Sequence, residues 1–195
     1  MLARALASVS RQTVPPDTVI VPIDFEGVGA AATRNRAAAQ ATTTWLAFLD
    51  DDDELAHNHI EDLLDFAEET GADMVYPWFT TVGVDKSALL TVNDEGQLVS
   101  PEGVPFGAAQ REMIAAGPEG DGRNFIPVTV LIRRSTFIDA GGFPLPNSDE
   151  WPHAANEDWG LFQKLAKSDA VIQHLNSRTW FWHFHSHSTL GGALR

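Results

Sequence analysis

Along the 195-residue chain, segments whose hydrophobic residues have helical spacing alternate with short hydrophobic segments that are typical of strands. Helical spacing predicts helices at residues 2–10, 30–41, 60–71, 135–140 and 156–166. Compact apolar runs rich in β-branched residues predict strands at residues 18–24, 45–49, 74–79, 126–133 and 171–175. Helices and strands that alternate in this way predict an α/β fold, with a central sheet flanked by helices, in one domain over residues 1–195.

The most distinctive stretch is the strand expected at residues 45–49, which runs directly into Asp50-Asp51-Asp52-Asp53-Glu54. Carboxylates this close repel one another, so some must be protonated, turn into water or share a cation. Hard divalent ions such as Mg²⁺ or Mn²⁺ prefer oxygen ligands. An acidic helix N-terminus, where Asp side chains cap free N–H groups, explains the same run equally well.

The charge balance narrows the classes of partner. Thirteen Lys and Arg against 27 Asp and Glu give a net charge of −14, which argues against non-specific binding to nucleic acid or to an anionic membrane. The chain has no Cys, so disulfides and zinc–thiolate sites are excluded. No apolar run approaches the roughly 20 residues that span a bilayer, and the apolar start is too short for a secretory signal. We expect a cytoplasmic location.

Two further groups of residues carry candidate chemistry. His183, His185 and His187 alternate, so an extended chain places them on one face near any cation that the aspartates bind, although each alone is more typical of a solvated surface. Glu157 and Asp158 begin a helix, where acids commonly serve the dipole, but a partly buried carboxylate also suits a general base. Residues 80–122 lose periodicity and predict an irregular segment over the active face.

These segments, in this order, resemble the family 2 inverting glycosyltransferases of the GT-A fold, with a mixed, mostly parallel sheet. The resemblance covers most of the chain. Its motifs are Ala7–Thr13, the helix start Gly29–Asn35, the DxD-bearing strand Trp45–Asp53, the turn Leu131–Ser135 with Gly141-Gly142-Phe143, the "ED" helix start Asn156–Trp159, and the closing strand Thr179–Thr189.

The resemblance implies roles on the donor side. Asp52 and His185 are the expected ligands of a Mn²⁺ or Mg²⁺ ion that bridges the donor diphosphate. Asp50 is expected to contact the nucleotide ribose, or the metal through water. Asp24 is expected to contact the nucleoside, and Arg34 to lie near the base or the phosphates.

The resemblance also implies roles on the acceptor side. Asp158 is the expected base that deprotonates the acceptor hydroxyl, and Trp159 is expected to line the acceptor pocket. Glu157 and Asp51 are grouped with the substrate-binding side chains, although Asp51, like Asp53, is also interpreted as a spacing and capping residue.

The expected function is metal-dependent, inverting transfer of a hexose from a nucleotide-diphosphate donor, with UDP-hexose as the expected donor. The acceptor is unassigned among glycans, lipids, proteins and modified bases, and the oligomeric state is open. Two alternatives remain, a non-catalytic module that binds a sugar nucleotide or metal and a metal-dependent hydrolase. The family begins with a strand beside the DxD strand, whereas Met1 here already starts the first helix, so we expect that strand to be missing from this chain.

Overall fold

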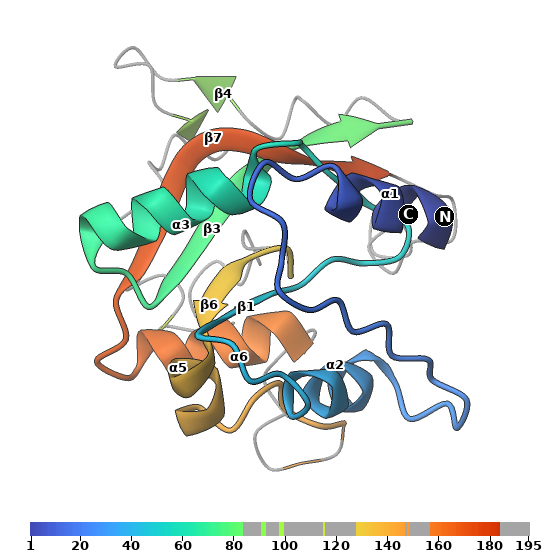
Figure 1. The fold of residues 1–195 in the computed structure, drawn as a ribbon. Coiled ribbons are helices and arrows are strands. Elements are labelled where there is room, and N and C mark those ends of the chain that lie inside the picture. The colour runs from blue at the N-terminus through green and yellow to red at the C-terminus, as the bar shows by residue number, and fades with distance from the viewer. Residues whose placement is uncertain are drawn as a thin grey trace.

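The structure, a computed structural model, describes residues 1–83, 91–92, 98–99, 115, 128–146, 148 and 157–183. Its helices are α1 (Leu2–Ser10), α2 (Ala30–Ala38), α3 (His59–Thr70), α5 (Arg134–Asp139) and α6 (Glu157–Ala166). Its strands are β1 (Trp45–Ala47), β2 (Glu54–Leu55), β3 (Met74–Val82), β4 (Thr91–Val92), β5 (Leu98–Val99), β6 (Leu131–Arg133) and β7 (Ile172–His183). Figure 1 shows these elements around one curved sheet.

The main sheet has the strand order β1-β6-β3-β7-β2, and β4 pairs with β5 separately. The sheet is mixed, as expected, with β3 parallel to β7. The other pairings described in this sheet, β1 with β6, β3 with β6 and β2 with β7, are antiparallel and shorter than the parallel pairing of β3 with β7. Antiparallel β6 separates β1 from β3, and residues 18–24 join no strand.

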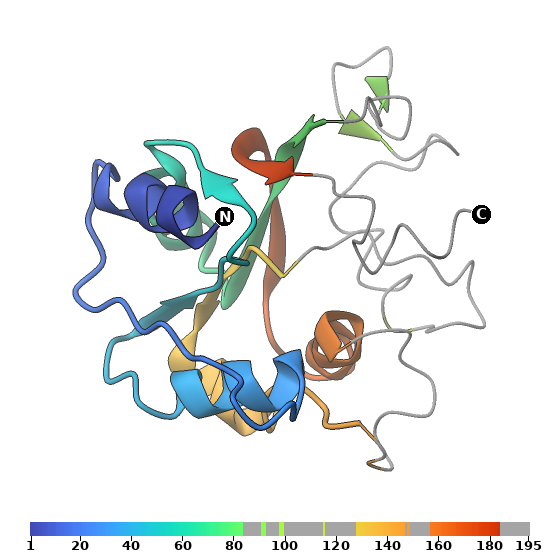
Figure 2. The same ribbon diagram turned by 90° about the vertical axis from the view of Figure 1, so that its right-hand side faces the viewer.

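Helices cover both faces of the sheet (Figure 2). On one face, α2, α5 and α6 enclose the larger core, which receives Met74 and Tyr76 from β3 and Ile132 from β6. On the other face, α3 packs on Val75 and Leu131, which point the opposite way because side chains alternate along a strand. Both faces of β3 and β6 are therefore buried.

Several boundaries confirm the sequence pattern. The first helix is α1, Leu2–Ser10, as predicted. Helix α3 ends at Gly71, whose φ of 67° is the left-handed conformation that favours glycine there. Helix α2 is shorter than expected and ends at Ala38, whereas β7 is longer and continues to His183. No helix within the described residues is long and apolar enough to cross a membrane.

The strand predicted at residues 18–24 is wrong. These residues make no backbone ladder, and the side chain of Arg36 donates a hydrogen bond to the carbonyl of Ile23 at 2.9 Å. Pro22 removes one backbone donor from the segment. Between this segment and β1 lies a hollow of about 550 Å³, lined by apolar side chains that include Ile20 and Leu46. Strand β1 therefore pairs with β6 on one side and borders this hollow on the other.

Candidate functional site

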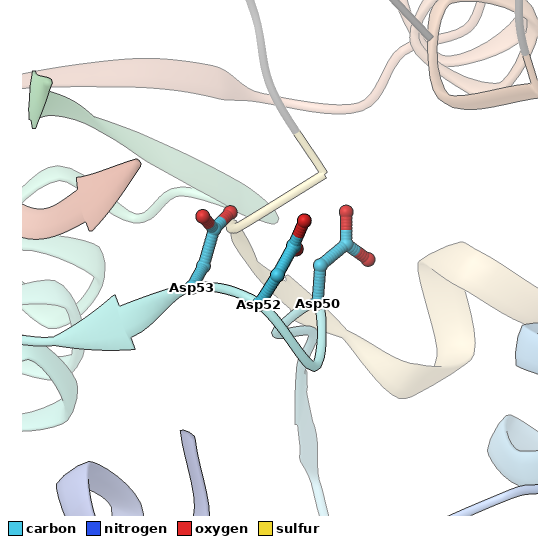
Figure 3. A group of neighbouring side chains, drawn as sticks. All are labelled: Asp50, Asp52 and Asp53. Atoms are coloured by element: carbon cyan, nitrogen blue, oxygen red, sulfur yellow. The ribbon is translucent and has the colours of Figure 1, made fainter. Parts of the chain in front are cut away.

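The acidic run lies on a tight turn between β1 and β2. The backbone N–H of Asp53 donates to the carbonyl of Asp50 at 3.2 Å, the bond that closes a β-turn. Asp51 is at the exposed corner, while the side chains of Asp50, Asp52 and Asp53 project to one side (Figure 3). Each of these three offers a carboxylate oxygen, and the three oxygens lie within 4.8 Å of one another. We call Asp50, Asp52 and Asp53 the acidic cluster.

The acidic cluster decides between the two interpretations of the run. An acidic helix N-terminus is wrong, because the turn leads into β2 and the next helix, α3, begins only at His59. Three converging carboxylate oxygens are the donor set that a hard divalent ion prefers, so the residues present fit Mg²⁺ or Mn²⁺. Of the predicted site residues in this run, Asp50 and Asp52 belong to the acidic cluster and Asp51 does not.

Asp53 has a role that the sequence pattern did not reveal. It caps no helix. Its carboxylate accepts a hydrogen bond at 2.9 Å from the backbone N–H of His183, at the end of β7. Asp53 is 3% exposed, and burial, followed by the neighbouring charges of Asp50 and Asp52, raises its pKa to about 7. The only sequence signal was the turn spacing, which brings the first and fourth aspartates together.

Asp158 lies in the first turn of α6, beside Glu157. Its Oδ1 accepts a bond at 2.6 Å from the backbone N–H of Trp159, so it does serve the start of the helix. Burial raises its pKa to about 7, and the adjacent Glu157 charge acts in the same direction. A carboxyl group with this pKa takes up a proton near neutral pH more readily than an ordinary aspartate, which suits a general base.

Arg34 connects the acidic cluster to the start of α6. From α2, its Nη2 donates to Oδ1 of Asp50 at 2.5 Å, and its Nη1 donates to Oε1 of Glu157. The guanidinium carbon lies 5.7 Å from the centroid of the Phe143 ring. The chain therefore brings together two groups of acids that are far apart in the sequence, with one cation between them.

Of the predicted histidines and Trp159, the structure describes His183 and Trp159. His183 lies beside the cluster, with Nε2 3.7 Å from Oε2 of Glu54. His185, the predicted metal ligand, and His187 lie outside the described residues. Trp159 is 2% exposed and belongs to the larger core, so its contact with an acceptor stays a prediction.

Asp24 is exposed, on the loop that leads into α2. Its two carboxylate oxygens accept bonds from the backbone N–H groups of Val28 at 2.9 Å and Gly29 at 2.8 Å. These bonds, that from Gly29 first, lower the pKa of Asp24. Asp24 thus shapes the turn that begins α2, and its predicted contact with a nucleoside stays a prediction.

The raised pKa values of Asp53 and Asp158 predict how stability depends on pH. Because folding raises the pKa of Asp53 and Asp158 to about 7, the folded chain binds more protons than the unfolded chain between about pH 4 and 7. The free energy of unfolding should fall as pH rises through this window, on the order of 2 kcal/mol per carboxyl, or about 5 °C in Tm. Thermal unfolding in EDTA at pH 5 and pH 8 measures this decrease in stability.

Asparagine variants supply the control for this pH dependence. Asp53→Asn and Asp158→Asn should each flatten the decrease in Tm, because each removes one of the two groups that bind the additional protons. Asp169→Asn, an exposed position beyond α6, should leave the decrease unchanged. A Tm of the parent chain that stays constant or rises between pH 5 and pH 8 would show that the two carboxyls titrate normally.

Comparisons with known proteins found one family model and several solved structures that are similar to this chain. Residues 23–92 match the family model described as Glycosyl transferase family 2, a stretch that contains Asp24, Arg34 and the acidic cluster. A comparison with curated proteins finds no significant match.

Among solved structures, S. aureus TarS 1–349 in complex with UDP-GlcNAc aligns with a TM-score of 0.61 and 15% identity, over 100% of this chain and 58% of that chain. The complex of TarS 1–349 with UDP gives a TM-score of 0.58 and 16% identity, over 95% of this chain and 57% of that one. This chain therefore spans less than two thirds of the TarS chains. Likeness at these identities shows a shared fold. The shared fold is the GT-A fold of glycosyltransferases. The similarity to family 2 in sequence covers residues 23–92.

Proposed function

We propose that the chain is a metal-dependent, inverting glycosyltransferase, which moves a hexose from a nucleotide-diphosphate donor to an acceptor hydroxyl. The observation that carries this proposal is the pairing of two sites across Arg34. The acidic cluster lies on one side, and Asp158, with a pKa raised to about 7, lies on the other.

The donor side of the proposal rests on the acidic cluster. Asp50, Asp52 and Asp53 would hold Mn²⁺ or Mg²⁺, and His185 is the further ligand proposed from the sequence. A bound divalent ion supplies positive charge that stabilises a nucleoside diphosphate as it leaves. UDP is the proposed nucleotide, and the structures of TarS with UDP and with UDP-GlcNAc support it through the shared fold.

The acceptor side of the proposal rests on Asp158. Its carboxylate would take the proton of the acceptor hydroxyl as the oxygen attacks the anomeric carbon. Attack from the face opposite the leaving diphosphate breaks the bond to that group in the same step and inverts the anomeric centre. Holding donor and acceptor together supplies much of the acceleration, because a reaction of two molecules becomes effectively unimolecular.

A transfer assay tests the proposed function. The chain is incubated with Mn²⁺ and a panel of UDP-hexoses, with glycan, lipid and protein acceptors, and the products are identified by mass spectrometry. We expect UDP release that depends on both Mn²⁺ and an acceptor, and a product of inverted anomeric configuration by NMR. Release of free sugar or phosphate without any acceptor would instead support the metal-dependent hydrolase.

One observation favours a second function. Strand β1 leads into the acidic cluster, and its edge beside the hollow pairs with no other strand among the described residues, so the proposed nucleotide side of the fold has a free sheet edge. A GT-A module that binds a sugar nucleotide without turnover is consistent with this edge. Calorimetry separates the two functions, because the module would bind UDP with Mn²⁺ and yield no product with any acceptor.

A further inference from the structure

Arg34 holds one carboxylate from each half of the proposed site. Asp50 belongs to the acidic cluster at the end of β1, and Glu157 immediately precedes Asp158 on α6. The Arg34 side chain is 17% exposed, so the bridge is largely removed from water. A guanidinium has donors in a rigid planar fork, and each arm here is used by a different element of the fold.

We propose that Arg34 is a positioning residue, which sets the spacing between the acidic cluster and Asp158. This inference rests on the proposed function and adds to it a residue that joins the donor side to the acceptor side. Its bond to Glu157 fixes the first turn of α6, and Asp158 is the next residue of that turn. Its bond to Asp50 fixes the same turn relative to the acidic cluster.

Packing alone does not account for a charged residue at this position. The guanidinium lies against the ring of Phe143, which also contacts the rings of Phe48 and Phe137. An apolar side chain would pack against these rings without the cost of burying charge, and replacing a buried ion pair by apolar residues is often neutral or stabilising. What Arg34 adds is a fixed distance between two carboxylates.

The distance matters because the proposed reaction is a single displacement. The diphosphate on the cation side and the base on the α6 side must both be aligned with one anomeric carbon, and a shift of about 1 Å costs on the order of 100-fold in rate. Arg34→Lys keeps the charge but has one ammonium group, which replaces a planar fork by a point charge. We expect Arg34→Lys to lower kcat about 100-fold, with KM for the UDP-sugar and the affinity for Mn²⁺ each within about threefold.

Chemical rescue supplies a readout that a purely structural role would not change. In Arg34→Ala, added guanidinium at tens of millimolar should restore kcat at least about tenfold, whereas methylammonium at the same concentration should not, because only the planar ion can contact both carboxylates. Arg36→Lys is the matched control on the same helix. Arg36 is exposed and donates to the carbonyl of Ile23 at 2.9 Å, so its replacement should change kcat less than about twofold.

Several results would overturn the positioning role. One is full kcat in Arg34→Lys. Another is a loss confined to KM, which would place Arg34 on the donor phosphates. Equal rescue by guanidinium and methylammonium would show that charge alone matters. If Arg34→Ala does not fold, as judged by circular dichroism, the kcat and KM of Arg34→Lys decide.

A double-mutant cycle separates this inference from the proposed function. Asp50→Asn and Glu157→Gln, measured by thermal unfolding in EDTA, should shift Tm non-additively, because both carboxylates share Arg34. In an Arg34→Gln background, the two shifts should become additive. If the parent chain transfers sugar but the Tm shifts of Asp50→Asn and Glu157→Gln are additive, the positioning role of Arg34 is wrong and the proposed function stands. A parent chain without transfer would overturn the proposed function, and the positioning role with it, whatever the cycle shows.

Discussion

Replacing Asp158 with asparagine is expected to lower kcat by about 10²–10⁴-fold, the range that a general base contributes. The amide keeps the shape of the side chain and cannot accept the acceptor proton. Because the acidic cluster is untouched, the affinity for UDP with Mn²⁺ should stay within about twofold. Steady-state kinetics of UDP release, together with calorimetry of UDP binding, measure the two effects on one preparation.

The pH profile provides a further check on Asp158. With its pKa near 7, kcat/KM of the parent chain should rise through neutral pH and level off above about pH 8, because the base must be ionised. Asp169→Asn removes the same charge at an exposed position and should leave both kcat and the profile unchanged. Full transfer activity in Asp158→Asn would show that another group takes the proton.

Replacing Asp52 with alanine should reduce Mn²⁺-dependent binding of UDP by about 100-fold or more, because the acidic cluster loses one of its three oxygen ligands. The substitution should preserve one local hydrogen bond of the backbone. Arg4 donates to the backbone carbonyl of Asp52, which alanine retains. Calorimetry of UDP binding, with and without Mn²⁺, measures the loss.

Asp65→Ala is the matched control for this loss. Asp65 is an exposed residue of α3, so its replacement removes one negative charge away from the acidic cluster. We expect its UDP affinity to stay within about twofold of the parent. If Asp52→Ala binds UDP and Mn²⁺ as well as the parent chain does, the assignment of Asp52 as a metal ligand is wrong.

Local patterns predicted much of the fold. The amphipathic spacing of α1 and the glycine that ends α3 were sufficient, because both depend on residues within a few positions of each other. The helix predicted at residues 156–166 is α6, Glu157–Ala166, and it followed from the same rule. The position of the acidic run at the end of β1 was also predictable, since an apolar strand that meets charge must reach the surface there.

Long-range contacts account for what the sequence did not reveal. Residues 18–24 have the composition of a strand, yet a strand exists only where a neighbour supplies hydrogen bonds, and that neighbour is not specified locally. The bond from His183 to Asp53 and the bridge through Arg34 join residues more than a hundred positions apart. Side-chain type gave candidates for these contacts, but only the fold selected the partners.

In the turn that carries the acidic cluster, substituting a residue and deleting a residue should have different effects on the site. Its corner residue, Asp51, lies outside the cluster, so other polar residues there should leave the three carboxylates in place. Deleting that corner would still leave three consecutive aspartates in the sequence. The bond from the fourth residue to the first would be lost, however, and with it the convergence of the side chains. Consecutive aspartates in a sequence are therefore insufficient to form the site, because the site depends on the number of residues in the turn as well as on their charges.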